Sequence, residues 1–318
     1  MVLNERVLNS MGGLTRCGKL PAFQNYREFV MAANPRRSLL YMPGSNARAL
    51  EKARSLDADV LIFDLEDAVA PGQKKLAREQ VLAAVNAGGY GRRELVVRVN
   101  GFDTEWGRKD IEAFATAPIS ALCLPKVESA AEIQAVVQVL NQAGAAASLK
   151  LWAMAETPRG ILAVNEIAGA HSRMGGIVLG TSDLAKDLRV PHTPQRLGML
   201  TSLSLCVLAA RANGIDVFDG VHLDLDDESG LALACEQGVE LGFDGKTLIH
   251  PKQIALTNQL FAPSLESLAR AKKIQMAWQQ AEAEGKGVVL VDGRLVEALH
   301  VEEAVRVLAI AEQIANTR

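Results

Sequence analysis

Short apolar runs recur along the chain, and each is followed by a turn and then by a stretch with helical periodicity. Eight of these runs predict strands, at 38–42, 59–65, 94–99, 120–125, 149–155, 175–180, 214–219 and 245–249. Helical patterns lie between them, at 47–56, 74–85, 108–116, 130–140, 158–167, 196–212 and 228–237, and another begins near Lys252. The pattern therefore predicts eight successive strand–helix units.

Eight such units favour an α/β fold of the (β/α)8 TIM barrel type with a C-terminal helical arm. An open doubly wound sheet is the alternative, but no glycine-rich dinucleotide fingerprint follows any of the strands. We expect an N-terminal extension (1–35), a barrel catalytic domain (36–262) and a C-terminal arm (263–318). In the arm, a long charged helix over 265–283 precedes the sequence EGKGVVLVDGRLVEALHVEEA. This sequence is interpreted as a ninth strand–helix unit outside the barrel.

Ionisable and polar residues follow nearly every predicted strand. The set consists of Tyr41, Asp64, Glu66, Arg98, Lys126, Glu156, Asp183, Asp219 and His250. In a barrel of this type the active site forms at the C-terminal ends of the strands. A purely structural barrel has no need for so many charges on one rim, so the sequence predicts a metal ion and an anionic ligand there.

Glu156 and Asp183 are the best pair of metal ligands, because each follows an apolar run and the two runs are consecutive. Two carboxylates without a nearby Cys or His suit Mg²⁺, which keeps several waters and takes substrate oxygens for its other positions. The alternative for each carboxylate is a cap at the start of the following helix. Arg98 lies between two valines and suits a substrate carboxylate or a developing enolate oxygen. Its alternative role is a structural ion pair with Asp64 or Glu66.

Arg48 and Lys52 are four residues apart on the first helix and therefore share one face. With Tyr41 below them they could bind phosphate groups at the rim, and the alternative is a solvated basic face. His250 ends an apolar run and could contact a ligand through its ring or its backbone.

The bulk properties exclude several classes of protein. The chain has 318 residues, a net charge of −3 and a pI of about 6.0, so no basic field favours nucleic acid. No apolar run reaches the length of about 18 residues that a membrane span needs. The four cysteines are scattered and form no CxxC pair, which favours buried thiols in a reducing compartment. No signal-peptide pattern is present in the sequence, and together these features favour a cytoplasmic protein.

Around these residues, the sequence resembles the citrate lyase β-subunit-like family of the HpcH/HpaI aldolase superfamily, which includes malyl-CoA and citramalyl-CoA lyases. The resemblance rests on an ordered set of phrases: RRSLLYMPGSN (36–46), FDLEDAV (63–69), KLAR (75–78), VRVNG (97–101), LPKVES (124–129), AETPRG (155–160), GTSDL (180–184), GKTLIHPKQ (245–253) and LVDGR (290–294). Any one of these phrases alone would be weak, but the set extends from residue 36 to about 300.

The resemblance implies a barrel with an arm, assembled as a homotrimer or a hexamer. It implies Mg²⁺ held by Glu156 and Asp183, and Asp292 supplied by the neighbouring subunit as the acid/base group. The residues that it implies for contact with the acyl-CoA substrate are Tyr41, Arg48, Lys52, Arg98, Glu156, Ile249 and His250. The family arm usually continues after Asp-Gly and a basic residue with Met-Ile-Asp, whereas this chain has Leu-Val-Glu297, so substrate preference could differ.

The predicted reaction is cleavage of citramalyl-CoA, malyl-CoA or citryl-CoA to acetyl-CoA and a 2-keto acid by reverse Claisen chemistry. The alternatives are a citrate lyase β subunit acting on an acyl-carrier-protein thioester, and an HpcH-type aldolase that acts without CoA. Hydrolysis of the thioester and a non-catalytic scaffold are further alternatives.

Overall fold

The computed structural model describes residues 35–316 of the chain. The expected N-terminal extension therefore lies outside the described residues, except for Pro35, and so does Cys17. The chain divides into two compact units, one spanning Pro35–Ala262 and the other including the segment from Pro263 onward. Each unit is considered by itself.

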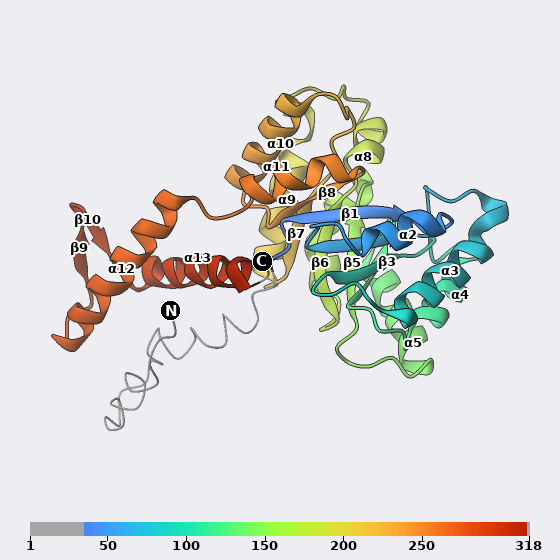
Figure 1. The fold of residues 1–318 in the computed structure, drawn as a ribbon, viewed down its shortest axis with the longest axis horizontal. Coiled ribbons are helices and arrows are strands. Elements are labelled where there is room, and N and C mark those ends of the chain that lie inside the picture. Colours follow the sequence, from blue (N-terminus) through green and yellow to red (C-terminus); the bar gives the residue numbers. More distant parts are fainter. Residues whose placement is uncertain (1–34, 317–318) are drawn as a thin grey trace. The chain divides into compact units, whose positions relative to one another are not determined.

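Eight parallel strands of the first unit close into a barrel, in which each strand pairs with the next and the last pairs with the first (Figure 1). The strands are β1 (Ser38–Pro43), β2 (Val60–Asp64), β3 (Glu94–Arg98), β4 (Ala121–Leu124), β5 (Lys150–Ala155), β6 (Met174–Leu179), β7 (Asp216–Asp219) and β8 (Gly245–Leu248). The predicted (β/α)8 barrel is thus confirmed, and all eight predicted strands are present.

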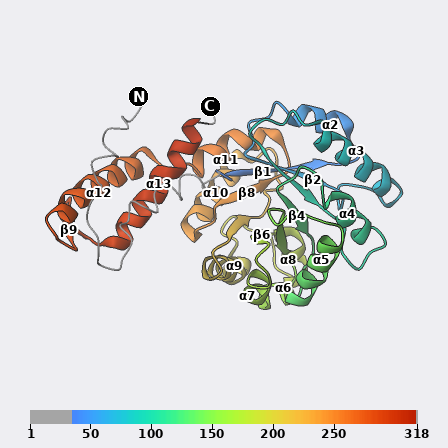
Figure 2. The same cartoon turned by 90° about the horizontal axis from the view of Figure 1, so that it is seen from below.

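Helices surround the strands (Figure 2). They are α2 (Ala47–Ala53), α3 (Lys74–Ala87), α4 (Gly107–Phe114), α5 (Ala130–Gln142), α6 (Pro158–Leu162), α7 (Val164–Ala168), α8 (Thr181–Leu188), α9 (Leu200–Ala212), α10 (Glu228–Leu241) and α11 (Ile254–Leu260). Three short 3₁₀ turns precede α3, α9 and α11: η2 (Pro71–Gln73), η3 (Leu197–Met199) and η4 (Pro251–Gln253). The helix predicted over 158–167 is divided at Ala163, and α8 was not predicted.

Side chains alternate between the inside and the outside of the barrel, because successive residues of a strand point to opposite faces. The inner core contains Leu39, Val60, Ile62, Val96, Ala121, Cys123, Trp152, Met154, Val178 and Phe218. Outward residues such as Leu40 and Leu61 pack instead against the helices. Counting two residues onward along each strand places Tyr41, Asp64, Arg98 and Glu156 in line with the inner core, at the C-terminal end of the barrel.

Arg36 packs against the inner core at the N-terminal end of the barrel. Its guanidinium lies over the Trp152 ring, 5.6 Å from the ring centroid. It also donates to Glu94 Oε2 at 2.6 Å and Oε1 at 2.9 Å, and it pairs with Asp216. Glu94 and Asp216 begin β3 and β7, so one arginine joins the two strands beneath the inner core.

The second unit is built from two long helices and a hairpin: α12 (Leu265–Ala283), β9 (Val289–Val291), β10 (Arg294–Val296) and α13 (Ala298–Asn316). A small core of its own includes Ile274, Trp278, Val296 and Val301. Strands β9 and β10 pair antiparallel through the turn Asp292-Gly293, and both turn residues have positive φ, 49° and 74°. Such Asp-Gly turns join adjacent antiparallel strands. The segment is therefore a hairpin followed by a helix, and not the predicted ninth strand–helix unit.

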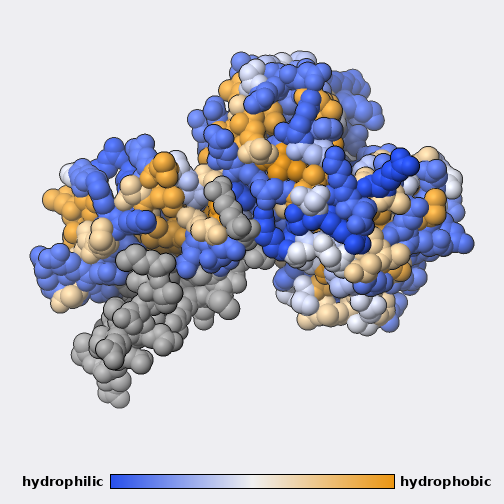
Figure 3. All heavy atoms as spheres, in the orientation of Figure 1, coloured by the Kyte–Doolittle hydropathy of each residue, from blue (hydrophilic) through white to orange (hydrophobic). Residues whose placement is uncertain are grey.

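Hydrophilic residues cover much of the face of the molecule drawn in Figure 3, with apolar patches between them. None of the helices between residues 35 and 316 combines the length and apolar character that a membrane span needs. Cys123, Cys206 and Cys235 are buried free thiols, as expected from their apolar surroundings in the sequence.

Candidate functional site

A cavity of about 430 Å³ opens at the C-terminal end of the barrel, which we call the barrel mouth. Strand ends and the start of α8 supply its lining, which includes Tyr41, Asp64, Asp67, Arg98, Met154, Glu156, Gly180, Asp183, Thr247 and Ile249. The cavity is therefore at the position where barrels of this type carry their active sites.

Arg98 is buried at the end of β3 and is surrounded by carboxylates. Its Nε and Nη2 donate to the two oxygens of Asp64, each at 2.7 Å, and its Nη1 lies 2.9 Å from Glu66 Oε2. The guanidinium also stacks on the Tyr41 ring, 4.8 Å from the ring centroid. Burial alone would lower the pKa of Arg98, but the charge of Asp64 outweighs it and raises the pKa. The alternative role as an ion pair with Asp64 and Glu66 is thus present, and the same guanidinium lines the cavity.

Glu156 follows β5 and is only 3% exposed. Its Oε1 accepts a hydrogen bond of 2.7 Å from the backbone N–H of Lys126, a residue with φ of 51°. Its Oε2 lies against Gly180, where a Cβ atom would be 2.2 Å away. Burial raises the pKa of Glu156 to about 7, and the negative charge of Glu66 adds to this rise. The hydrogen bond from Lys126 and the positive charges of Arg98 and Lys126 lower this pKa, but they offset burial only in part.

Asp183 lies in the first turn of α8 and not on a strand. Its side chain is 35% exposed, and its Oδ2 lies 3.7 Å from Lys126 Nζ. The same ammonium lies 3.1 Å from Glu66 Oε1. Asp183 nevertheless lines the same cavity as Glu156, because α8 begins directly after β6.

The residues at the mouth fit a hard divalent cation. All of the candidate ligand atoms are carboxylate oxygens, and Lys126 places one positive charge among Glu66 and Asp183, beside the buried Glu156. Within residues 35–316, no group of three or more His, Cys, Asp or Glu side chains is placed to hold a metal ion by itself. Glu156 and Asp183 would therefore supply two ligands, and substrate and water would supply the others, as is usual for Mg²⁺.

The structure brings only part of the predicted substrate-contact set into the cavity. Tyr41 and Ile249 line it. Arg48 and Lys52 lie on α2 as exposed side chains and are not part of its lining. His250 is exposed as well, and its Nδ1 caps η4 by accepting a backbone N–H. The contact of Arg48 and Lys52 with phosphate groups therefore stays a prediction, and so does the alternative of a solvated basic face.

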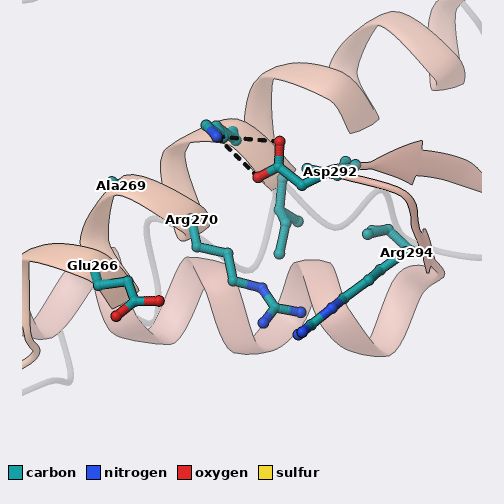
Figure 4. A pocket seen from close by; sticks show the side chains of 9 residues that line it. Glu266, Ala269, Arg270, Asp292 and Arg294 are labelled. Carbon is teal, nitrogen blue, oxygen red and sulfur yellow. Dashed lines mark hydrogen bonds and ion pairs between the residues drawn. The ribbon is translucent and has the colours of Figure 1, made fainter.

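Asp292 belongs to the second unit, at the tip of the hairpin. Lys273 on α12 donates to its two oxygens at 2.9 Å and 3.2 Å, and the Asp292 side chain is 63% exposed. A second cavity of about 320 Å³ lies beside it, lined also by Arg270, Arg294 and Glu266 (Figure 4). Asp292 is therefore an exposed carboxylate, held in an ion pair with Lys273 at the edge of this cavity.

Sequence reasoning placed Lys126 at a strand end but gave it no role. Lys126 has a left-handed backbone and contacts carboxylates from three segments. Both features depend on tertiary structure, so no local sequence pattern predicts them. Gly180 was also missed, although a glycine between an apolar run and Thr-Ser-Asp is a signal for close packing.

Comparison with known proteins identifies the family. A family model described as HpcH/HpaI aldolase/citrate lyase matches residues 37–251. A (3S)-malyl-CoA thioesterase from Cereibacter sphaeroides is 51% identical over 286 residues, which cover 90% of this chain and 98% of the relative. A citrate lyase subunit beta from Haemophilus influenzae is 38% identical, covering 87% of this chain and 97% of the relative.

Solved structures give the same result. CitE from Mycobacterium tuberculosis, in complex with magnesium, acetoacetate and coenzyme A, superimposes with a TM-score of 0.70 and 30% identity, covering 88% of this chain and 99% of that one. The resemblance inferred from the sequence motifs is thereby confirmed. The chain belongs to the HpcH/HpaI aldolase/citrate lyase family and is an enzyme of the carbon–carbon lyase class.

Proposed function

We propose that this enzyme binds Mg²⁺ through Glu156 and Asp183 and acts on the CoA thioester of a 3-hydroxy dicarboxylic acid of the malyl-CoA type. Its reaction is reverse Claisen cleavage to acetyl-CoA and a 2-keto acid. The observation that carries the proposal is the convergence of Arg98 with these two carboxylates in one cavity at the barrel mouth. The magnesium and coenzyme A of the CitE complex support the same choice of ligands.

The bound magnesium ion would act as a Lewis acid toward the hydroxyl and carboxylate oxygens of the substrate. When the carbon–carbon bond breaks, the hydroxyl carbon becomes the carbonyl carbon of the keto acid and the hydroxyl proton passes to solvent water, so that one proton is released here and one is taken up later by the enolate carbon. The electron pair passes to the acetyl-CoA fragment as an enolate. Arg98 stabilises the charge on the thioester oxygen, and its two bonds to Asp64 keep the guanidinium fixed before the charge develops.

Protonation of the enolate carbon would complete the reaction, and we assign this step to Asp292 of a neighbouring subunit. The exposure of Asp292 at a hairpin tip supports the assignment, since an exposed ion pair such as that with Lys273 is weak and can give way to a substrate. The assignment requires a homo-oligomer, for which a trimer or a hexamer is proposed.

Hydrolysis of the thioester is the second candidate, and the 51% identity to a (3S)-malyl-CoA thioesterase favours it. In that reaction water attacks the thioester carbonyl, and the products from malyl-CoA are malate and CoA. The similarity to citrate lyase subunit beta keeps open an acyl-carrier-protein thioester as the substrate. The aldolase that acts without CoA has no comparable support.

The test is product analysis with purified full-length protein, Mg²⁺ and malyl-, citramalyl- or citryl-CoA. Cleavage gives acetyl-CoA with glyoxylate, pyruvate or oxaloacetate, whereas hydrolysis gives free CoA and the hydroxy acid. Glu156→Gln and Asp183→Asn should remove Mg²⁺-dependent turnover and retain the circular dichroism of the fold. Wild-type turnover in either variant would refute the metal assignment.

The contribution of Asp292 across subunits has its own test. Asp292→Asn and Arg98→Met homo-oligomers should each be inactive. Oligomers assembled from both variants should regain part of the activity, because some sites then receive an intact Arg98 and an intact Asp292. Absence of recovery in verified mixed oligomers would contradict the arrangement.

A further inference from the structure

Lys126 contacts three carboxylates at the barrel mouth, those of Glu66, Glu156 and Asp183. The proposed reaction gives Lys126 no role. Its backbone N–H donates to Glu156 at 2.7 Å. Its ammonium lies 3.1 Å from Glu66 and 3.7 Å from Asp183. These carboxylates come from the segments after β2 and β5 and from the start of α8, so one residue joins three parts of the rim.

The backbone of Lys126 explains how one residue makes these contacts. Its φ of 51° lies in the left-handed region, which non-glycine residues seldom adopt and which costs free energy. In this conformation the N–H meets the Glu156 carboxylate, and the side chain extends to the carboxylates of Glu66 and Asp183. The two contacts are chemically separate, because any residue other than proline can supply the N–H, but only a cationic side chain can supply the charge.

The lysine side chain is also free to leave. It is 50% exposed, whereas Glu66 is largely buried and already has a second cation in Arg98. An ammonium on a flexible four-carbon stem can move into solvent without unfolding its surroundings. The charge that it now supplies among the carboxylates is the charge that a bound metal ion would supply in its place.

We propose that Lys126 is a built-in counter-cation, which neutralises the carboxylates of the metal-free enzyme and must yield its position to Mg²⁺. The proposal rests on the assignment of Glu156 and Asp183 as metal ligands. Its consequence is that the ammonium weakens Mg²⁺ binding, while the backbone N–H keeps Glu156 in place with or without the metal. Once the ammonium has moved into solvent, about 6 Å from the metal and in the dielectric of water, its repulsion of a doubly charged ion corresponds to an effect of about tenfold on the dissociation constant.

Isothermal titration of the full-length protein with Mg²⁺ alone tests the proposal. Lys126→Met keeps the N–H and most of the stem but removes the charge, and should lower the dissociation constant for Mg²⁺ about tenfold. Lys126→Arg should retain a value near that of the wild type. Lys75→Met is the matched control, because Lys75 is 83% exposed on α3 and its loss changes the net charge equally. A Lys126→Met protein that binds Mg²⁺ as the wild type does, or more weakly, would overturn the inference.

A measurement on the wild type covers the case in which Lys126→Met does not fold. Acetylation of Lys126, followed by mass spectrometry, should increase on adding Mg²⁺ relative to that of Lys75, because the ammonium is released from its carboxylates. Unchanged acetylation at saturating Mg²⁺ would overturn the inference. If the wild type binds no Mg²⁺, the metal assignment itself fails; if Glu156→Gln abolishes binding but Lys126→Met leaves it unchanged, only the role of Lys126 fails.

Discussion

Gly180 packs so closely against Glu156 that an added methyl group at this position should displace the Glu156 carboxylate. A Cβ at this residue would lie 2.2 Å from Glu156 Oε2 and 2.4 Å from Glu156 Cβ, whereas ordinary contacts begin at 3.4 Å. The Oε2 atom could rotate away, but the Cβ atom is fixed to the backbone after β5. Relief of the clash therefore requires a backbone shift of about 1 Å, together with loss of the hydrogen bond from Lys126.

We expect Gly180→Ala to lower the free energy of unfolding by about 2–4 kcal/mol, since overpacking costs about 1–3 kcal/mol and loss of the hydrogen bond about 1 kcal/mol. Displacement of Glu156 should weaken Mg²⁺ binding by about 10–100-fold. Urea unfolding measures the first quantity, and isothermal titration measures the second.

Gly72→Ala is the matched control for the same substitution. No atom lies within 4 Å of a Cβ built at Gly72, and its φ is not in the left-handed region. This variant should be unchanged or more stable by less than about 1 kcal/mol. If Gly180→Ala matched this control in stability and in Mg²⁺ affinity, the packing of Glu156 on Gly180 would be wrong.

Three further predictions concern charge and metal. Asp219→Asn should cost about 3–5 kcal/mol at pH 7 by urea unfolding, because it leaves buried Lys246 and Arg196 without their shared carboxylate. Burial alone would raise the pKa of Asp219, but the charges of Lys246 and Arg196 outweigh it and lower that pKa. The ionised Asp219 therefore stabilises the fold fully above the unfolded pKa of about 3.9. As the pH falls below about 4, the difference in stability between Asp219→Asn and the wild type should shrink. Arg98→Lys should lower kcat at least about 100-fold in a steady-state assay, since an ammonium cannot reproduce both bonds to Asp64, and a near-normal kcat would contradict the role of the guanidinium. Removal of Mg²⁺ with EDTA should abolish turnover with unchanged far-ultraviolet dichroism, and Mg²⁺ at 100 times its dissociation constant should restore about 2.7 kcal/mol of stability.

The fold could be predicted from the sequence because barrel strands are short apolar runs with turns after them. The same alternation places part of the candidate site: in β5, Trp152 and Met154 point inward, so Glu156 two residues later enters the cavity. Arg98 follows Val96 in the same way on β3. Where a site residue continues the alternation of a strand, the local sequence pattern predicts that its side chain faces the cavity.

The remainder of the site depends on contacts that no local pattern contains. Asp183 was expected at a strand end but lies in the first turn of α8, because that helix begins directly after β6. Arg48 and Lys52 have the predicted spacing on a helix, yet spacing alone does not say which way the shared face points. The ammonium of Lys126 finds partners 60 and 57 residues away in the chain, a relation that only the closed barrel creates.

The packed interior of the barrel has a kinetic consequence. The inner core residues are buried, and Arg36 packs against Trp152, so we expect ligands to enter and leave the cavity by the mouth. In the proposed reaction the keto acid lies deeper, against Glu156, and the CoA fragment lies between it and solvent. Release should therefore be ordered, with acetyl-CoA leaving first, and the keto acid should inhibit competitively against the thioester while acetyl-CoA inhibits noncompetitively.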